Sequence, residues 1–412
     1  MNKLFLMTIL LVMVFFIACN LDVDGRNESG MAIDKDNNIY IIGDTWKGNS
    51  GIIDNENILL IKFSNDGEKE WEKKLETESN DIGRFIITDK NNNFYIVGET
   101  DGKLDDNISI GKRDVFIAKF NSDGQKQWLK QWGTSEDEFI HSLSINEDGD
   151  IYAIGKTSGS FDNYLNAGKY DIFLTKFNNT GDIQWTKQWG TNENDNVSFI
   201  KIINNNNIYI TGWIFDGSGG YTSSDKNDIF LIKINNENEE FIKQWTTLNM
   251  VIDVTINNNE EVYVISDTES LSDENSDIKK NNILLTKFNI KGEEQWKNNM
   301  GSSGSDGAYS LITRNRNIYI TGKTRGSFAG SSNKGETDAF LAKFDDKGDK
   351  LWIKQWGTSE MDTGQSIVID SNGNAFVSGE TMGSFDGYEN ESISDVFLSK
   401  FDKDGNKLWT KL

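Results

Sequence analysis

The strongest constraint on the fold is a unit of about 57 residues that repeats along the chain. The clearest marker of this unit is a lysine within a short apolar run such as "FLAKF". Its spacings are 57, 57, 57, 54, 56 and 57 residues, at Lys62, Lys119, Lys176, Lys233, Lys287, Lys343 and Lys400. A period of this length indicates supersecondary units that bury their apolar faces only by packing on their neighbours. Seven units fill the chain from about residue 28 onward.

Each unit contains four short apolar runs separated by turn residues. In the last unit the runs are "SIVID" (366–370), "AFVSGET" (375–381), "DVFLSKF" (395–401) and "NKLWTKL" (406–412). They are rich in β-branched and aromatic residues and are bounded by Gly, Asn or Asp, which is typical of strands joined as hairpins. No helical period follows residue 20. Proline is absent, so the turns must be made by the 38 glycines and by Asn and Asp.

Four strands in each of seven units predict an all-β fold, a seven-bladed β-propeller with four antiparallel strands per blade, over 28–412. A linear solenoid is the alternative, and it requires atypical capping units at its ends. The first and last units resemble the middle ones, which favours a closed, monomeric ring. Every blade is expected to come from contiguous sequence, so closure should depend on packing between the first and last blades.

The N-terminal residues differ from the rest of the chain. Lys3 is the only charge in 1–19, and 4–18 is apolar except for Thr8. Such a run is too short to span a bilayer comfortably, which takes roughly 20 residues, and it suits a secretory signal. It ends in "FIAC", which resembles a bacterial lipobox with Cys19 as the lipidated residue.

The expected organisation is therefore a signal peptide over 1–19, a polar tether over 20–27 and a lipid anchor in the cell envelope, on the outer membrane or the cell surface. An uncleaved anchor, or an ordinary signal with an incidental cysteine, remains the alternative.

Composition and charge exclude several classes of function. A formal net charge of −23 argues against nucleic-acid binding, which is driven by Lys and Arg neutralising phosphates. The single histidine, His141, excludes a zinc site made of several histidines. Turns such as "NSDGQ" lack the distant bidentate Glu of a calcium loop. "GSGG" (217–220) is not followed by the Gly-Lys-Ser/Thr of a phosphate loop. We therefore expect no metal and no cofactor, and no catalytic residue is assigned.

The repeated pattern resembles a known family. The pattern "D-[apolar]-F-[LI]-x-K-F … DG … W … WG … D-G-N … Y-[VI]-x-G-x-T" is similar to the SBBP β-propeller repeat of bacterial exported proteins. The resemblance covers nearly the whole chain after the N-terminal segment. It implies the propeller fold and export from the cytoplasm, and it implies no particular activity.

Residues that recur in every unit are expected to support the blade. One such tryptophan is predicted to pack against the adjacent blade, and the marker lysines are predicted to extend along the surface or to pair with carboxylates between blades. An Asp or Asn at the start of the third run is expected to cap the loop backbone. The "GSF" phenylalanines of three loops, Phe161, Phe328 and Phe385, are expected to anchor those loops. The tryptophans are Trp71, Trp128, Trp185, Trp245, Trp296, Trp352 and Trp409.

Residues that differ between units are the candidates for a binding site. Alignment of the units places His141 level with Ser29, Arg84, Ser198, Ile252, Ala308 and Gln365, near one mouth of the central channel. The long loops between second and third runs should project from one face. The most irregular of these carries Trp213, Phe215, Asp216 and Tyr221 within 213–227, and the first unit contributes Trp46. Aromatic residues beside acidic and amide groups suit sugar or peptide contacts.

The expected function is a non-enzymatic, lipid-anchored binding or scaffold module for a protein or glycan partner. One alternative is a polysaccharide lyase or hydrolase, and a purely structural subunit of an envelope assembly is another. An enzyme should show a pocket at the channel mouth, with a carboxylate or tyrosine of shifted pKa beside His141 or Arg84.

Overall fold

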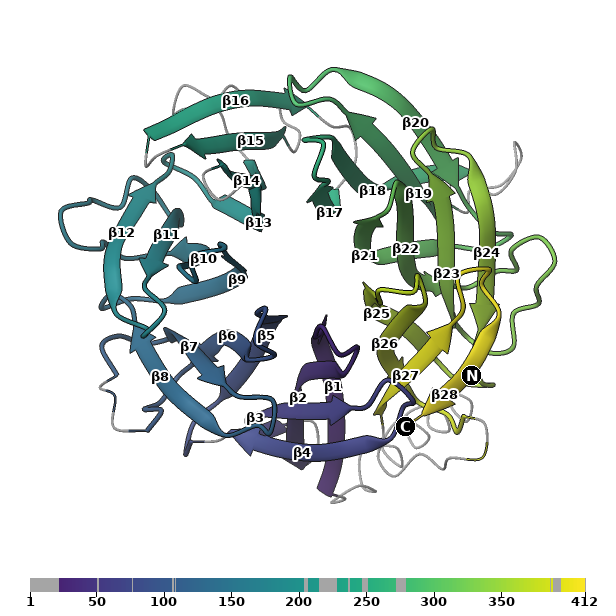
Figure 1. The fold of residues 1–412 in the computed structure, drawn as a ribbon, viewed down its shortest axis with the longest axis horizontal. Coiled ribbons are helices and arrows are strands. Elements are labelled where there is room, and N and C mark those ends of the chain that lie inside the picture. The colour runs from purple at the N-terminus through teal and green to yellow at the C-terminus, as the bar shows by residue number, and fades with distance from the viewer. Residues whose placement is uncertain are drawn as a thin grey trace, which may run out of the picture.

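The computed structural model of the chain is a ring of seven four-stranded antiparallel sheets around a central channel (Figure 1). It describes residues 22–411, except 50–51, 76, 106, 108, 204–206, 215–227, 236–237, 247–250, 272–278, 386 and 388–393. The predicted seven-bladed β-propeller is confirmed. The described residues contain no helix long and apolar enough to cross a membrane.

The strands follow the chain in blade order. Blades 1 to 4 consist of β1 (Asp22–Ile33), β2 (Ile39–Asn49), β3 (Ile52–Phe63), β4 (Lys69–Leu75); β5 (Asp81–Thr88), β6 (Phe94–Thr100), β7 (Asp114–Phe120), β8 (Lys126–Trp132); β9 (Glu138–Ile145), β10 (Ile151–Thr157), β11 (Asp171–Phe177), β12 (Ile183–Trp189); and β13 (Asp195–Ile203), β14 (Asn207–Ile214), β15 (Asp228–Asn235), β16 (Asn238–Thr246). Blades 5 to 7 consist of β17 (Val251–Ile256), β18 (Val262–Leu271), β19 (Lys279–Phe288), β20 (Glu294–Met300); β21 (Asp306–Arg314), β22 (Asn317–Thr324), β23 (Asp338–Asp345), β24 (Lys350–Trp356); and β25 (Asp362–Ile369), β26 (Ala375–Thr381), β27 (Asp395–Phe401), β28 (Lys407–Lys411).

Each sheet is formed by four consecutive strands, so every blade comes from contiguous sequence as expected. The first strand of each blade lines the channel and the fourth lies at the rim (Figure 1). Strand β1 begins at Asp22, before the boundary expected at residue 28, because residues 22–27 pair with 44–49 of β2. Most of the stretch expected as a tether is therefore part of the first blade.

The apolar core is divided into clusters that each join two neighbouring blades. The cluster between blades 7 and 1 combines Ile41 and Leu59 with Phe376 and Leu398, all of them buried, and it closes the ring. Both faces of a blade are covered in this way, so a second strand such as β6 is buried along its whole length. Burial of apolar surface from both sides explains why the strands lack a simple alternation of apolar and polar residues.

The recurring tryptophan packs against the next blade, as predicted. A Cβ added to Gly405 would lie 2.9 Å from a ring atom of Trp352, which belongs to the preceding blade. Gly405 has φ +81, a conformation that favours glycine, so the hairpin turn and the tryptophan fit together only when this residue lacks a side chain. Trp409 meets Gly67 in the same way between blades 7 and 1.

The marker lysines differ in part from the expectation. Each ammonium lies over an aromatic ring of the second strand in its own blade, at 4.9–5.5 Å from the centroid: Lys62 on Tyr40, Lys119 on Tyr95, Lys176 on Tyr152, Lys233 on Tyr209, Lys287 on Tyr263, Lys343 on Tyr319 and Lys400 on Phe376. The carboxylates that some of them meet lie within the same blade, such as Asp150 for Lys176 at 3.0 Å. Described hydrogen bonds from these ammonium groups to the next blade go mainly to backbone carbonyls.

Other repeated polar residues are occupied by the blade itself. Asp171 accepts hydrogen bonds from the Ala167 N–H (2.9 Å) and from Gln188 Nε2 (3.0 Å), which caps the loop before β11 as predicted. In the turn before β28, Asp402 Oδ1 accepts from the N–H groups of Asp404 and Asn406. The described residues hold no group of three or more His, Cys, Asp or Glu that could bind a metal ion.

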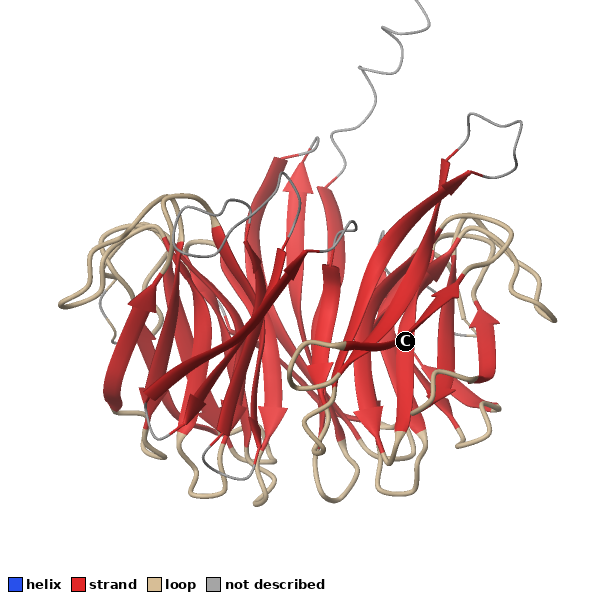
Figure 2. Cartoon of the chain, turned by 90° about the horizontal axis from the view of Figure 1, so that it is seen from above, coloured by secondary structure: helices blue, strands red, loops and turns tan. Residues whose placement is uncertain are grey.

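The two faces of the ring differ. Connections between second and third strands lie on the same face as the connections between blades, and in blades 2 to 7 they are longer than the hairpin turns (Figure 2). We call this the loop face, and the opposite face, with the short turns of the hairpins, the turn face. On the loop face Phe161 packs on Phe173 at 5.2 Å and Phe328 on Phe340 at 5.4 Å, so these residues anchor their loops as expected.

Candidate functional site: the channel mouth

Every blade carries a β-bulge in its first strand, near the loop face. One residue of the strand has no partner on the second strand, and such a bulge re-aims the side chain that it carries. We call these unpaired residues the bulge ring. Its members are Ser29, Arg84, His141, Ser198, Ile252, Tyr309 and Gln365.

The bulge ring coincides with the positions that the sequence places level with His141, except in blade 6. There the expected residue, Ala308, is buried and pairs with Gly322, whereas Tyr309 is the unpaired residue. The expectation for Ala308 was therefore wrong by one residue, because the apolar pattern does not reveal where a bulge inserts its extra residue.

A second set of variable residues lies beside the bulge ring, on the second strands. We call it the flanking ring, and its members are Asp44, Glu99, Lys156, Trp213, Asp267, Lys323 and Glu380. Each follows the fifth residue of the repeated strand pattern, which is Gly in six blades and Ser266 in blade 5.

Sequence reasoning selected Trp213 from this ring and missed the other members. The sequence contained a signal for this ring, because the residue type at this position varies while the residues before and after it are nearly constant.

In three blades a bulge residue contacts the flanking residue of its own blade. Arg84 donates from Nη2 to Glu99 Oε2 at 2.8 Å, Gln365 donates to Glu380 Oε1 at 2.7 Å, and Lys323 lies 5.3 Å from the ring centroid of Tyr309. Burial by itself would lower the pKa of Arg84, but attraction by Glu99 outweighs it and raises the pKa. In each of these three blades, one residue of the pair is a hydrogen-bond donor or a cation, and the other is an acceptor or an aromatic ring.

Blade 3 differs from these three blades because it places two basic side chains together. Burial lowers the pKa of His141 to about 4, and repulsion by Lys156 and Arg84 adds to the effect. His141 is therefore neutral at pH 7, and its buried Nδ1 has no hydrogen-bond partner among the described residues. Burial also lowers the pKa of Lys156, whose ammonium donates to Asn196 Oδ1 of blade 4 at 2.8 Å.

We call Arg84, Glu99, His141, Lys156 and Asn196 the mouth cluster. Its only carboxylate, Glu99, is 2% exposed, and both of its oxygens are engaged. Oε2 accepts from Arg84, and Oε1 accepts from the Ile140 N–H of blade 3 at 3.2 Å. A carboxylate held in this way joins two blades and is poorly placed to transfer protons to a substrate. The cluster is better suited to recognising a polar or acidic group than to acid–base catalysis.

The other predicted site residues fall in different places. Trp213 lies on β14, where its backbone pairs with Asn196 and Ile229. Trp46 lies on β2, two residues beyond the flanking ring towards the loop face. Phe215, Asp216, Tyr221 and Cys19 lie outside the described residues. The structure therefore brings His141 and Arg84 together at the mouth and places the backbone of Trp213 at the same level.

Comparisons with known proteins agree with this architecture. A 163-residue stretch is 24% identical to the regulatory protein FlaEY of Caulobacter vibrioides, covering 35% of this chain. A 233-residue stretch is 21% identical to an uncharacterized WD repeat-containing protein of Acanthamoeba polyphaga mimivirus, covering 47% of this chain. The aligned part amounts to 17% of the length of each of these two relatives. The crystal structure of the polysaccharide lyase Uly1 matches with a TM-score of 0.50 at 11% identity, over 92% of this chain and 90% of the lyase chain, which shows a shared fold alone.

The ring of repeated blades defines the protein as a seven-bladed β-propeller repeat protein. A family model for the SBBP β-propeller repeat matches residues 351–386, which run from β24 through β26. One repeat of the chain therefore matches the SBBP β-propeller repeat, which the repeated sequence pattern also resembles.

Proposed function

We propose that the protein is a non-enzymatic binding or scaffold module, anchored to the cell envelope by lipid on Cys19, that presents its loop face to a protein or glycan partner. The observation that carries the proposal is the contrast between constant and variable positions. Tryptophans, lysines and loop-capping carboxylates repeat around the ring and hold it together. The combination of bulge residue and flanking residue is different in every blade, and these residues gather at one mouth.

A rigid scaffold with variable residues at one end is the usual arrangement of a binding protein. The mouth offers a guanidinium (Arg84), a neutral imidazole (His141) and a partly exposed phenol (Tyr309) within one ring of bulges. Such an uneven ring suits an asymmetric ligand. The engagement of both Glu99 oxygens supports binding over the hydrolase or lyase alternative, since those reactions need an available acid or base.

The lipid anchor is supported by the N-terminal sequence, which ends its apolar run at the only cysteine of the chain. We expect Cys19→Ala to release the protein from membranes of the native host into the soluble fraction, because the apolar run is too short to span a bilayer. Metabolic labelling with a fatty acid should mark the wild-type protein and not the variant. A variant that stays labelled and membrane-bound would contradict the anchor.

The binding face is tested by affinity capture from the native envelope together with a glycan array. We expect the captured partner or glycan to be lost with Arg84→Gln and Tyr309→Ala combined, because both residues are exposed members of the bulge ring. Lys291→Gln is the matched control, since Lys291 is an exposed residue of a hairpin turn on the opposite face. Binding that survives the double variant and fails in the control would place the interaction on the turn face and overturn the proposal.

A further inference from the structure

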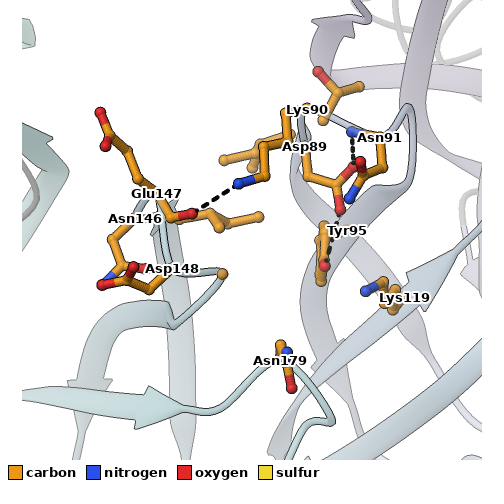
Figure 3. A pocket seen from close by; sticks show the side chains of 13 residues that line it. Asp89, Lys90, Asn91, Tyr95, Lys119, Asn146, Glu147, Asp148 and Asn179 are labelled. Carbon is orange, nitrogen blue, oxygen red and sulfur yellow. Dashed lines mark hydrogen bonds between the residues drawn. The ribbon is translucent and has the colours of Figure 1, made fainter.

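A pocket of about 470 Å³ opens on the turn face between blades 2 and 3, away from the channel mouth (Figure 3). The first turns of the two blades form its walls, and Lys119 and Asn179 complete it. Ile87 and Ile145 supply an apolar part of the lining. A volume of this order is that of a small-molecule site.

The pocket lies where other junctions between blades make a hydrogen bond that this junction lacks among its described residues. In blades 5, 6 and 7 the marker lysine donates to a carbonyl in the outer hairpin turn of the next blade: Lys287 to Asp346 at 3.2 Å, Lys343 to Lys403 at 3.1 Å and Lys400 to Asn65 at 2.8 Å. The residue that corresponds to these acceptors in blade 3 is Asn179. It lines the pocket and receives no such bond from Lys119.

Lys119 therefore presents a cation to the pocket. Its ammonium lies 5.0 Å from the centroid of the Tyr95 ring, and it has no hydrogen bond or ion pair to any residue in the described part of the chain. The hydroxyl of Tyr95 donates to Asp89 Oδ2 at 3.3 Å. A cation held on an aromatic face without a counter-ion is a ready partner for a ligand carboxylate.

The remaining charges limit the ligand. Lys90 and Lys119 face three carboxylates of the lining, Asp89, Glu147 and Asp148, so the pocket carries an excess of negative charge. A phosphate or sulfate would be repelled by these carboxylates. Asp148 and Lys119 lie on opposite sides of the pocket (Figure 3), an arrangement that complements a molecule with an ammonium at one end and a carboxylate at the other.

We propose that the pocket between blades 2 and 3 binds a small zwitterion, an amino acid or a dipeptide. The carboxylate of the ligand pairs with Lys119, its ammonium lies towards the Asp148 side, and an apolar side chain packs on Ile87 and Ile145. This pocket lies on the turn face, whereas the partner of the proposed function binds the loop face. Either proposal can therefore fail without the other.

Calorimetric titration of the intact mature protein with L-leucine and L-leucyl-L-leucine tests the site. We expect saturable binding of at least one of them, weakened at least tenfold when the carboxylate is converted to an amide or the amine is acetylated. Lys119→Met should cause a similar loss, whereas Lys343→Met should not, because that ammonium is already used between blades 6 and 7.

A second variant keeps the test valid even if Lys119→Met does not fold. Asn179→Asp alters an exposed turn residue and supplies a carboxylate beside Lys119, so it should abolish binding while the melting temperature is kept. The proposal is overturned if neither zwitterion binds, if the amide binds as well as the free acid, or if both pocket variants bind like wild type. Binding of glucuronate in place of the zwitterions would also overturn it, because a sugar acid has no ammonium.

Discussion

The junction between blades 6 and 7 and the junction between blades 2 and 3 are built from the same parts but end differently. Each packs a tryptophan against a turn glycine so closely that a Cβ added at Gly405 or at Gly181 would lie 2.9 Å from an indole atom. In the first junction the lysine bond to the next blade is made, whereas in the second a pocket takes its place. The second junction also brings Arg84 and Lys156 near His141 at the mouth. The shared parts hold the ring together, and the departures from them mark the candidate sites.

The largest expected effect concerns the shared tryptophan. We expect Trp352→Ala and Trp128→Ala each to lower the free energy of unfolding by about 2–3 kcal/mol, because a half-buried indole loses its packing against the next blade. Urea denaturation measures both values. Leu351→Ala is the control, since this neighbouring side chain is 51% exposed and should change stability little. A difference above roughly 1 kcal/mol between the two tryptophan variants would show that the junctions are not equivalent.

The contribution of the mouth of the second junction to the free energy of unfolding should depend on pH. The pKa of His141 falls from an ordinary 6.5 to about 4 in the folded state, so the unfolded chain binds more protons between these values. Stability linked to His141 is therefore present above pH 6.5 and is lost as the pH falls towards 4. We expect wild type to lose on the order of 1–2 kcal/mol relative to His141→Gln between about pH 7 and pH 5.

Thermal or urea unfolding of the two proteins across this range gives the comparison. The buried carboxyls with raised pKa, such as Asp195 at about 6, act in the opposite direction and cancel because both proteins contain them. Parallel stability curves for the two proteins would show that His141 titrates normally in the folded state.

The smallest effect separates the two lysines. Lys343→Met removes a hydrogen bond to the next blade, and we expect a loss of about 1 kcal/mol. Lys119→Met removes only the contact with Tyr95 and should cost about 0.5 kcal/mol or less. Urea midpoints of unfolding measure both losses, provided that the dependence of the unfolding free energy on urea concentration is the same for each variant and wild type. If the order of the two losses is reversed, then Lys119 has a partner outside the described residues.

The fold could be predicted well from the sequence because every blade repeats the same pattern of four short strands and turns. The second and third strands of blade 7 match the predicted ranges, 375–381 and 395–401. The first strand was predicted as 366–370 and begins at Asp362. Gly364 and the bulge at Gln365 interrupt its apolar pattern, so the period of two that identifies a strand is lost there.

The candidate sites were less accessible to sequence reasoning. Alignment of the repeats identified Arg84 and His141 as variable, but the pairing of Arg84 with Glu99 depends on which strand lies beside the bulge. The pocket was missed because Lys119 belongs to a set that repeats in every blade. Among the described residues, Lys119 lacks the bond to the next blade that three other marker lysines make, and it also lacks the carboxylate partner that Lys62 and Lys176 have. The lysine itself is the same residue in every blade and does not reveal this difference.

Closure without a shared sheet has a mechanical consequence. The described contacts between blades 7 and 1 involve side chains. Among them are Lys400 with Asn65, Ser371 with Asn37, Trp409 with Gly67, Lys411 with Glu68 and the apolar cluster around Phe376. A force that separates these two blades meets no ladder of strand hydrogen bonds among the described residues of the seam. Neighbouring blades elsewhere are separate sheets as well, but there the chain itself links one blade to the next. The ring should therefore open at the seam between blades 7 and 1 first under load, and each blade should then detach as an intact sheet.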